Sequence, residues 1–171
     1  MFNVYGKVVL IVDDSPSIRR EVRVILQKEG ITVREAGTEF GMFNTIDEYG
    51  EVADMILMDL TLVETTGFDL VAKIRSVERF KNIPVIMLTQ HSDRTNVLKA
   101  KNLGIQGYIV KPINSQILVE RVKKALEASI DGSITETGGI SAEPKKAEDT
   151  DTNEDTDIKA GPGAKDEDPE A

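Results

Sequence analysis

The sequence predicts an α/β protein with a doubly wound five-stranded parallel sheet flanked by five helices, followed by a disordered C-terminal tail. Three observations lead to this expectation. Short β-branched and apolar runs recur five times within the first 130 residues. Segments with apolar residues at helical spacing separate these runs, and such alternation indicates parallel strands with helices on both faces. Beyond residue 130 both patterns stop.

The expected strands are short and strongly apolar. They cover residues 7–12, 32–35, 55–58, 84–89 and 107–110. Three of them read KVVLIV, MILM and PVIMLT, which are nearly unbroken apolar runs typical of strands buried on both faces of a parallel sheet. In open α/β sheets the functional groups gather beyond the carboxyl ends of the strands. That edge is therefore where a site is expected.

The first helix is marked most clearly. Ser15 can cap it, Pro16 suits its first position, and Gly30 can end it. Its apolar stripe follows a 3.6-residue period and consists of Ile18, Val22, Ile25 and Leu26. A second, weaker helix is expected over residues 39–48.

Flanking residues place the other three helices. The third follows Gly67, and its apolar side consists of Phe68, Val71 and Ile74. The fourth starts near residues 92–93 and stops at Gly104. The last begins at residue 114 or 115, and its apolar positions are Ile117, Leu118, Val122, Ala125 and Leu126.

Charge divides the chain at residue 130. Residues 131–171 hold 13 acidic and 4 basic side chains and so carry the whole net charge of −9, whereas residues 1–130 hold 17 of each sign. The distal segment has only three large apolar residues and cannot bury enough surface to offset the entropy cost of ordering. We therefore expect a folded domain at 1–130 and an acidic, disordered tail or linker at 131–171.

Composition also excludes several classes of protein. The chain has no cysteine, so disulfides, thiol nucleophiles and cysteine-based metal sites are excluded. No apolar stretch approaches the roughly 20 residues that span a bilayer, and the N-terminus lacks the apolar region of a signal peptide. Neither part of the chain has the basic surface typical of nucleic-acid binding. A soluble, cytoplasmic protein without membrane insertion is expected.

Four of the expected strands deliver five chemically active side chains to one edge of the sheet. Asp13 and Asp14 follow the first strand, and Asp59 follows the third. Thr89 ends the fourth strand and Lys111 follows the fifth. A single carboxylate at a strand end usually caps a helix, but capping does not explain five such groups at the matching edge.

The chemistry of these groups is coherent. Three carboxylates in one cleft repel each other, which favours either protonation or binding of a divalent cation. All-oxygen ligands suit Mg²⁺, which usually takes one or two carboxylates together with phosphate oxygens. The central carboxylate, Asp59, could then attack a phosphoryl group while Lys111 supplies positive charge and Thr89 a hydroxyl donor. The residues therefore suggest phosphoryl chemistry.

The pattern resembles the receiver domain of two-component response regulators, the CheY-like superfamily, over about residues 5–128. The matching residues are Asp13, Asp14, Asp59, Thr89, Lys111 and Pro112. The intervals match as well, with 30 residues from Asp59 to Thr89 and 22 from Thr89 to Lys111. Tyr108 stands where the family has its switch aromatic, and Gly67 stands where it has the glycine after the third strand.

The resemblance implies a flavodoxin-like fold and a metal site. It implies that Mg²⁺, or Mn²⁺, is bound directly by Asp14, Asp59 and the backbone carbonyl of Thr61, with Asp13 acting partly through water. It also implies a cis peptide bond between Lys111 and Pro112.

The resemblance further implies a phosphorylation-dependent switch rather than an enzyme that acts on other substrates. A sensor histidine kinase or phosphotransfer protein would phosphorylate Asp59, with Thr89 and Lys111 assisting. Thr89 and Tyr108 would then alter the surface of the fourth helix, fifth strand and fifth helix, which binds a downstream protein or a second copy. Direct nucleic-acid binding by this segment is not expected. The protein is either a stand-alone regulator or the receiver part of a longer one.

Four positions qualify the resemblance. Val63 stands where many receivers have proline, and Gln90 stands where a small residue is usual, next to the space of the switch aromatic. Thr61 and His91 occupy the positions that in this family tune the access of water to the acyl phosphate. His91 follows a strand end, so a loop histidine is expected there rather than a phosphorelay histidine.

Two other classes share parts of this pattern. A haloacid-dehalogenase-like, Mg²⁺-dependent phosphatase also uses Asp, Thr or Ser, Lys and a metal, but it needs a second acid two residues after the nucleophile, where Thr61 stands. A flavin-binding domain would need a Ser/Thr/Gly-rich phosphate loop after the first strand. The sequence DDSPSIR at that place would repel phosphate unless a metal were present.

Overall fold

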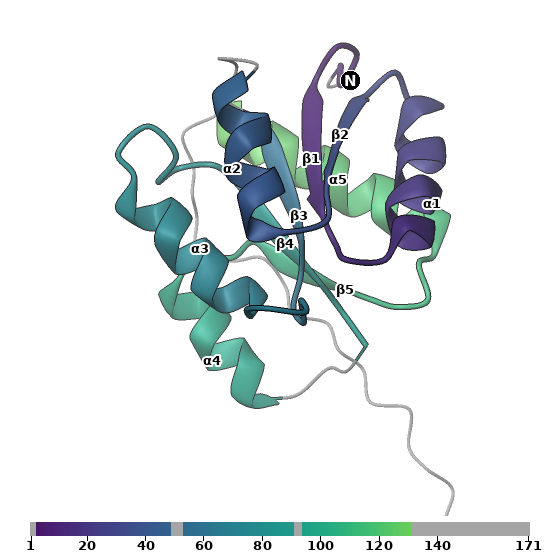
Figure 1. The fold of residues 1–171 in the computed structure, drawn as a ribbon. Helices are drawn as coiled ribbons and strands as arrows, with labels where there is room; N and C mark the ends of the chain where they lie inside the picture. Colours follow the sequence, from purple (N-terminus) through teal and green to yellow (C-terminus); the bar gives the residue numbers. More distant parts are fainter. Residues whose placement is uncertain (1–2, 49–52, 91–93, 131–171) are drawn as a thin grey trace, which may run out of the picture.

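A five-stranded parallel sheet forms the centre of the computed structural model, which describes residues 3–48, 53–90 and 94–130 (Figure 1). The strands are β1 (Val8–Val12), β2 (Thr32–Ala36), β3 (Met55–Asp59), β4 (Val85–Thr89) and β5 (Gly107–Val110). Their order is β2-β1-β3-β4-β5, and every neighbouring pair is parallel. The predicted fold class is confirmed. The expected tail at 131–171 lies outside the described residues.

The helices cover both faces of this sheet. They are α1 (Pro16–Gln27), α2 (Glu39–Glu48), α3 (Gly67–Ser76), α4 (Arg94–Asn102) and α5 (Ser115–Ile130). Figure 1 shows α2, α3 and α4 on one side of the sheet and α1 and α5 on the other. The chain thus winds in both directions from its central strands, as the doubly wound prediction requires.

Two apolar cores lie on either side of the sheet because successive strand residues face opposite ways. The core under α1 and α5 contains Ile11 and Leu57 from the two central strands. The core under α2 and α3 contains the next residue of each strand, Val12 and Met58. All four side chains are fully buried. Tight packing on both faces fixes the strand tips where β1 and β3 end.

Helix boundaries follow local capping chemistry. Ser15 accepts a hydrogen bond from the Ile18 N–H at 3.5 Å, and Pro16 starts α1 as predicted. The helix ends at Gln27, and Gly30 adopts a positive φ of 77° shortly afterwards.

The cap and the buried face of α3 were not fully predicted from the sequence. Thr66, which the sequence pattern did not reveal, caps α3 by accepting from the Asp69 N–H. The buried residues of α3 are Gly67, Leu70, Val71 and Ile74, whereas Phe68 is only partly buried. The predicted start of the fourth helix at residues 92–93 lies outside the described residues. α5 begins at Ser115, after Asn114 caps it through the N–H groups of its first turn.

Candidate functional site

Three carboxylates meet at the carboxyl ends of β1 and β3. One oxygen each from Asp13, Asp14 and Asp59 lies within 4.8 Å of the others. Asp13 is completely buried and Asp59 is 6% exposed, whereas Asp14 is exposed. The two strands are direct neighbours in the middle of the sheet, and their pairing holds the acidic residues together. The structure therefore brings the predicted acidic residues into one cluster.

Lys111 reaches this cluster from the end of β5. Its Nζ lies 2.8 Å from Asp13 Oδ2 and 3.1 Å from Asp59 Oδ2. Only 11% of the Lys111 side chain is exposed, so solvent screens these two ion pairs weakly. The peptide bond to Pro112 is cis, as the resemblance implies. One ammonium thus neutralises part of the charge of three carboxylates.

Backbone hydrogen bonds orient the two buried carboxylates. The Ser15 N–H donates to Asp13 Oδ1 at 2.9 Å, and the Thr61 N–H donates to Asp59 Oδ1 at 3.3 Å. Thr89, 2% exposed, ends the strand beside Asp59, and its carbonyl accepts from the Lys111 N–H at 2.7 Å. The strand ends therefore place all the predicted phosphoryl-handling residues at one edge.

Arg19 is a residue of this site that the sequence pattern did not reveal. Its Nη1 donates to the Asp13 carbonyl at 2.6 Å, and its Nε donates to Glu35 Oε2 at 3.3 Å. Arg23 binds the other Glu35 oxygen at 2.6 Å. Arg19 therefore ties α1 and β2 to the backbone between Asp13 and Asp14. Only the pairing of β2 with β1 could have indicated this bridge, because it brings Glu35 near the acidic residues.

Gly67 lies directly against the strand that ends in Asp59. Its N–H donates to the Leu60 carbonyl at 2.9 Å. A Cβ at position 67 would overlap the Asp59 carbonyl oxygen and would lie 2.7 Å from Met87 Cε. The close approach of two backbone segments therefore requires a residue without a side chain.

The charges of the cluster alter its proton affinities. Burial raises the pKa of the Asp59 carboxyl above its usual value; the hydrogen bond from Lys111 opposes this, and the charge of Asp13 reinforces it. Burial lowers the pKa of Lys111, but hydrogen bonds and attraction to Asp13 and Asp59 outweigh it, so the pKa is raised. Lys111 therefore stays charged, whereas burial disfavours the negative charge of Asp59.

We expect Asp59→Asn to raise the free energy of unfolding at pH 7 without divalent ions, because three carboxylates share one ammonium in the wild type. Because the Asp59 pKa is raised on folding, the folded chain binds a proton there more tightly than the unfolded chain does. The ionised carboxylate therefore opposes folding at higher pH, and the amide removes this cost. The gain should shrink as pH falls through the folded-state pKa. Urea unfolding of the variant and the wild type at several pH values measures the difference in free energy of unfolding. A difference that grows as the pH falls would contradict the argument.

Tyr108 lies apart from the carboxylates, on the side of the sheet that faces α4. Its hydroxyl donates to the Asn96 carbonyl at 2.7 Å and so joins β5 to α4. The ring is partly buried, and burial raises the pKa of the hydroxyl to about 12. Gln90, which directly follows Thr89, is exposed. The predicted loop position of His91 lies outside the described residues.

A surface hollow of about 280 Å³ adjoins the cluster at Asp14. It lies between the loop after β2 and the loop after β3, and Val63 lines it. Val63 is 84% exposed, so its side chain makes few contacts with the rest of the loop. This is the position at which many receivers have proline. The hollow also contains Glu39 and Glu64, which makes this approach to the site acidic.

The donor set suits a hard divalent cation. Three carboxylates supply oxygen ligands, and one ammonium leaves an excess of negative charge among largely buried groups. A cation that prefers oxygen ligands, such as Mg²⁺, relieves that excess. The acidic cluster of the structure therefore fits the metal that the sequence pattern predicts.

Comparisons with known proteins agree with this geometry. The family model described as response regulator receiver domain matches residues 9–123. The chemotaxis protein CheY of Pseudomonas aeruginosa is 33% identical over 119 residues, covering 70% of this chain and 95% of that protein. CheY1 of Helicobacter pylori is 36% identical over 118 residues, covering 68% and 94%.

Solved structures give the same result for the fold. The chemotaxis protein CheY4 of Vibrio cholerae superposes with a TM-score of 0.66 at 30% identity, covering 70% of this chain and 98% of that chain. Among the described residues, no helix is both long and apolar enough to cross a membrane.

Proposed function

The chain belongs to the response regulator receiver domain family, and from this premise we propose that Asp59 is its phosphoryl acceptor. Members of this family carry out phosphorylation-dependent signalling in two-component systems. One observation carries the assignment of the residue: Asp59 ends the central strand β3, within 4.8 Å of an oxygen of each of two other carboxylates and 3.1 Å from the ammonium of Lys111. The phosphatase alternative is not supported, because the chain matches the receiver family and Thr61 stands where a second acid would be needed.

The proposed transfer is an in-line displacement. A carboxylate oxygen of Asp59 attacks the phosphorus of a phosphohistidine, the new P–O bond forms, and the P–N bond breaks. Lys111 offsets the charge on the transferred oxygens, and the Thr89 hydroxyl donates a hydrogen bond to one of them.

The metal ligands belong to the same proposal. Asp13, Asp14, Asp59 and the carbonyl of Thr61 would hold Mg²⁺ or Mn²⁺. When bound, the ion neutralises charge on the phosphoryl oxygens. The Ser15 and Thr61 N–H groups keep the two buried carboxylates oriented before any phosphodonor arrives.

Phosphorylation adds a charge of about −1.5 to −2 at Asp59 and so changes what Lys111 and Thr89 bind. We infer that Thr89 moves toward the new group and that Tyr108 gives up its bond to Asn96, which shifts a two-state equilibrium of α4. The surface of α4, β5 and α5 would carry the signal. Its exposed apolar residues are Leu98, Val110 and Ile117.

The partners and the division of the chain are also proposals. The phosphodonor would be a sensor histidine kinase or a phosphotransfer protein, and the receiver of the signal would be a target protein or a second copy. We assign the receiver domain to residues 1–130 and a separate acidic segment to 131–171, in a cytoplasmic protein. The chain would catalyse only its own phosphorylation and dephosphorylation.

Intact-mass spectrometry after incubation with acetyl phosphate and Mg²⁺ tests the acceptor. We expect the wild type to gain one labile phosphoryl group, and Asp59→Asn to gain none. Asp54→Asn is the matched control, because Asp54 precedes the same strand at the opposite edge of the sheet and pairs with Lys7. It should be phosphorylated like the wild type. A stable phosphoryl adduct on Asp59→Asn would overturn the assignment. So would the absence of an adduct on the wild type, if the wild type also released no phosphate steadily.

A further inference from the structure

Positive charge gathers in the last quarter of the folded part. Residues 94–130 contain seven basic and two acidic side chains, although residues 1–130 as a whole are neutral. Two of the basic residues are already paired: Lys111 binds the acidic cluster, and Lys123 binds Glu29 of the α1 end at 2.6 Å. Five further basic residues belong to α4 and α5, and four of them have described side chains: Lys99, Lys101, Arg121 and Lys124.

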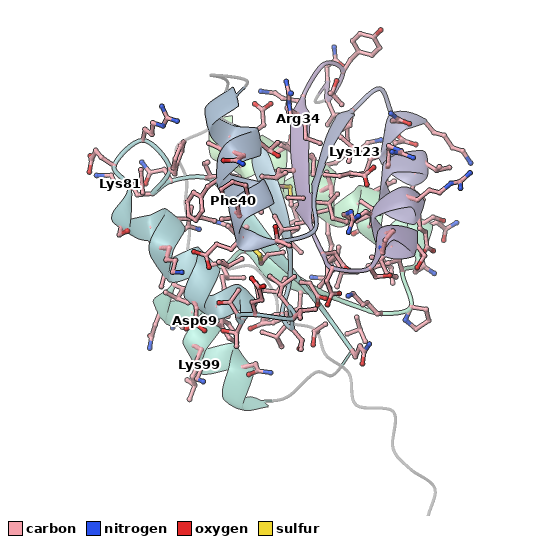
Figure 2. All side chains as sticks on the ribbon, viewed as in Figure 1. Arg34, Phe40, Asp69, Lys81, Lys99 and Lys123 are labelled. Carbon is pink, nitrogen blue, oxygen red and sulfur yellow. The ribbon has the colours of Figure 1, made fainter. Side chains whose placement is uncertain are left out.

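These four residues belong to α4 and α5, the helices on the two sides of the edge strand β5. Lys99 lies on the flank of α4 that faces α3, with its Nζ 5.9 Å from the Phe68 ring. Lys99 and Lys101 lie in the last turn of α4. Figure 2 shows the Lys99 side chain pointing away from the body of the molecule. Arg121 Nη1 would lie 3.5 Å from a Cβ on Gly107, so its guanidinium lies over the start of β5. Lys124 follows almost one turn later on α5, on the flank away from the Lys123–Glu29 pair.

The four side chains form what we call the basic rim: Lys99, Lys101, Arg121 and Lys124. Lys99, Lys101 and Lys124 are exposed, and Arg121 is partly buried. Within the part of the chain that the structure describes, none of the four forms an ion pair; Lys99 only approaches the Phe68 ring, at 5.9 Å. Glu120 and Glu127 lie about one turn from Lys124 on α5, but seven basic against two acidic side chains leave residues 94–130 with a net positive charge. Such a charge favours an acidic partner.

The chain itself supplies such a partner next to the rim. Residues 131–171 begin directly where α5 ends, and they hold 13 acidic against 4 basic side chains. Ile130, the last residue of α5, follows Lys124 of the rim by six residues. Any flexible coil of 41 residues would span about 35 Å, whereas the 16 residues of α5 span about 24 Å.

We propose that the acidic segment 131–171 binds back onto the basic rim and partly covers the α4–β5–α5 surface of its own chain. The attraction is electrostatic and intramolecular, so a modest affinity suffices because the tether keeps the local concentration high. The exposed Leu98 and Val110 lie on the surface that becomes covered. A protein that docks on this surface would have to displace the segment, which would reduce binding of weak partners. The inference does not depend on phosphorylation of Asp59.

A spin label on the chain of 171 residues tests the proposal directly. The sequence has no cysteine, so Thr152→Cys gives one attachment site within the acidic segment. Paramagnetic broadening of backbone amide signals should be strongest on α4, β5 and α5 and weak on α1 and α2. It should fade at about 1 M salt, where the Debye length is near 3 Å.

Charge reversals on two different surfaces test whether the acidic segment binds the basic rim. Lys101→Glu with Lys124→Glu should remove most of the broadening, because both exposed side chains belong to the rim. Arg20→Glu with Lys28→Glu changes the same charge at exposed positions of α1 and of its C-cap, and should leave the broadening unchanged. An unaltered pattern of the remaining amide signals establishes that each variant is folded.

Three outcomes would overturn the proposal. Broadening could be absent, or it could be spread evenly over all helices. It could also arise between molecules, which a mixture of labelled chains with isotope-enriched unlabelled chains detects. In that case a second copy, not the segment of the same chain, covers the rim.

Discussion

Lys111→Met lowers the free energy of unfolding by about 3 kcal/mol at pH 7 in the absence of divalent ions, because it leaves two buried carboxylates without their cation. Asp13 is fully buried, Asp59 nearly so, and Lys111 lies within 3.1 Å of both. Methionine keeps the length and apolar stem of the side chain, so the loss reports on charge rather than on packing. The loss should shrink as pH falls, because protonated carboxyls no longer need a counter-ion.

Lys123→Met is the matched control for this prediction. Lys123 also forms an ion pair, with Glu29 at 2.6 Å, but its side chain is 42% exposed and that of Glu29 is 34% exposed. Such a surface pair contributes at most about 1 kcal/mol. Urea unfolding of the two variants and the wild type, with and without Mg²⁺, makes the comparison. Mg²⁺ should restore part of the stability of Lys111→Met and none of that lost in Lys123→Met. Equal losses in the two variants would contradict a buried charge cluster.

The acidic site illustrates how far the sequence leads. Asp13, Asp59 and Lys111 each follow an apolar run, and parallel strands bring such positions to one edge whatever their order. The edge was therefore predictable from periodicity alone. The distances were not, because the closeness of Asp13 to Asp59 depends on β1 and β3 being direct neighbours. Strand order is a tertiary property that local patterns do not contain.

Arg19 and Phe68 show why the remainder was missed. Arg19 contacts Glu35 only because β2 lies beside β1, so nothing in its own helix marks the bridge that it forms to the Asp13 carbonyl. Phe68 has helical spacing with Val71, yet it is only partly buried, because Leu70 and Val71 form the face of α3 that contacts the sheet. In a short helix with apolar residues at several positions, the period does not decide which side faces inward.

We expect Gly67→Ala to lower the free energy of unfolding by about 3 kcal/mol and to displace the end of β3. The added methyl group would overlap the backbone carbonyl oxygen of Asp59, which cannot move aside as the end of a flexible side chain can. Relief of the overlap requires α3 and β3 to separate at the acceptor, so phosphorylation by acetyl phosphate should slow as stability falls. Thermal or urea unfolding and the rate of adduct formation measure the two effects.

Gly41→Ala is the matched control, since it places the same methyl group in a helix without a close backbone neighbour. At Gly41 the nearest atoms outside the helix backbone are Thr38 Oγ1, at 3.3 Å, and the Ala36 side chain, at 3.8 Å. Alanine there should stabilise the protein by up to about 1 kcal/mol through helix propensity. Opposite signs for the two substitutions would establish that the contact beneath Asp59, and not the loss of glycine, is responsible. If Gly67→Ala were as stable as the wild type, α3 would not press on the acceptor strand as the structure describes, and the acceptor would not be fixed in place from that side.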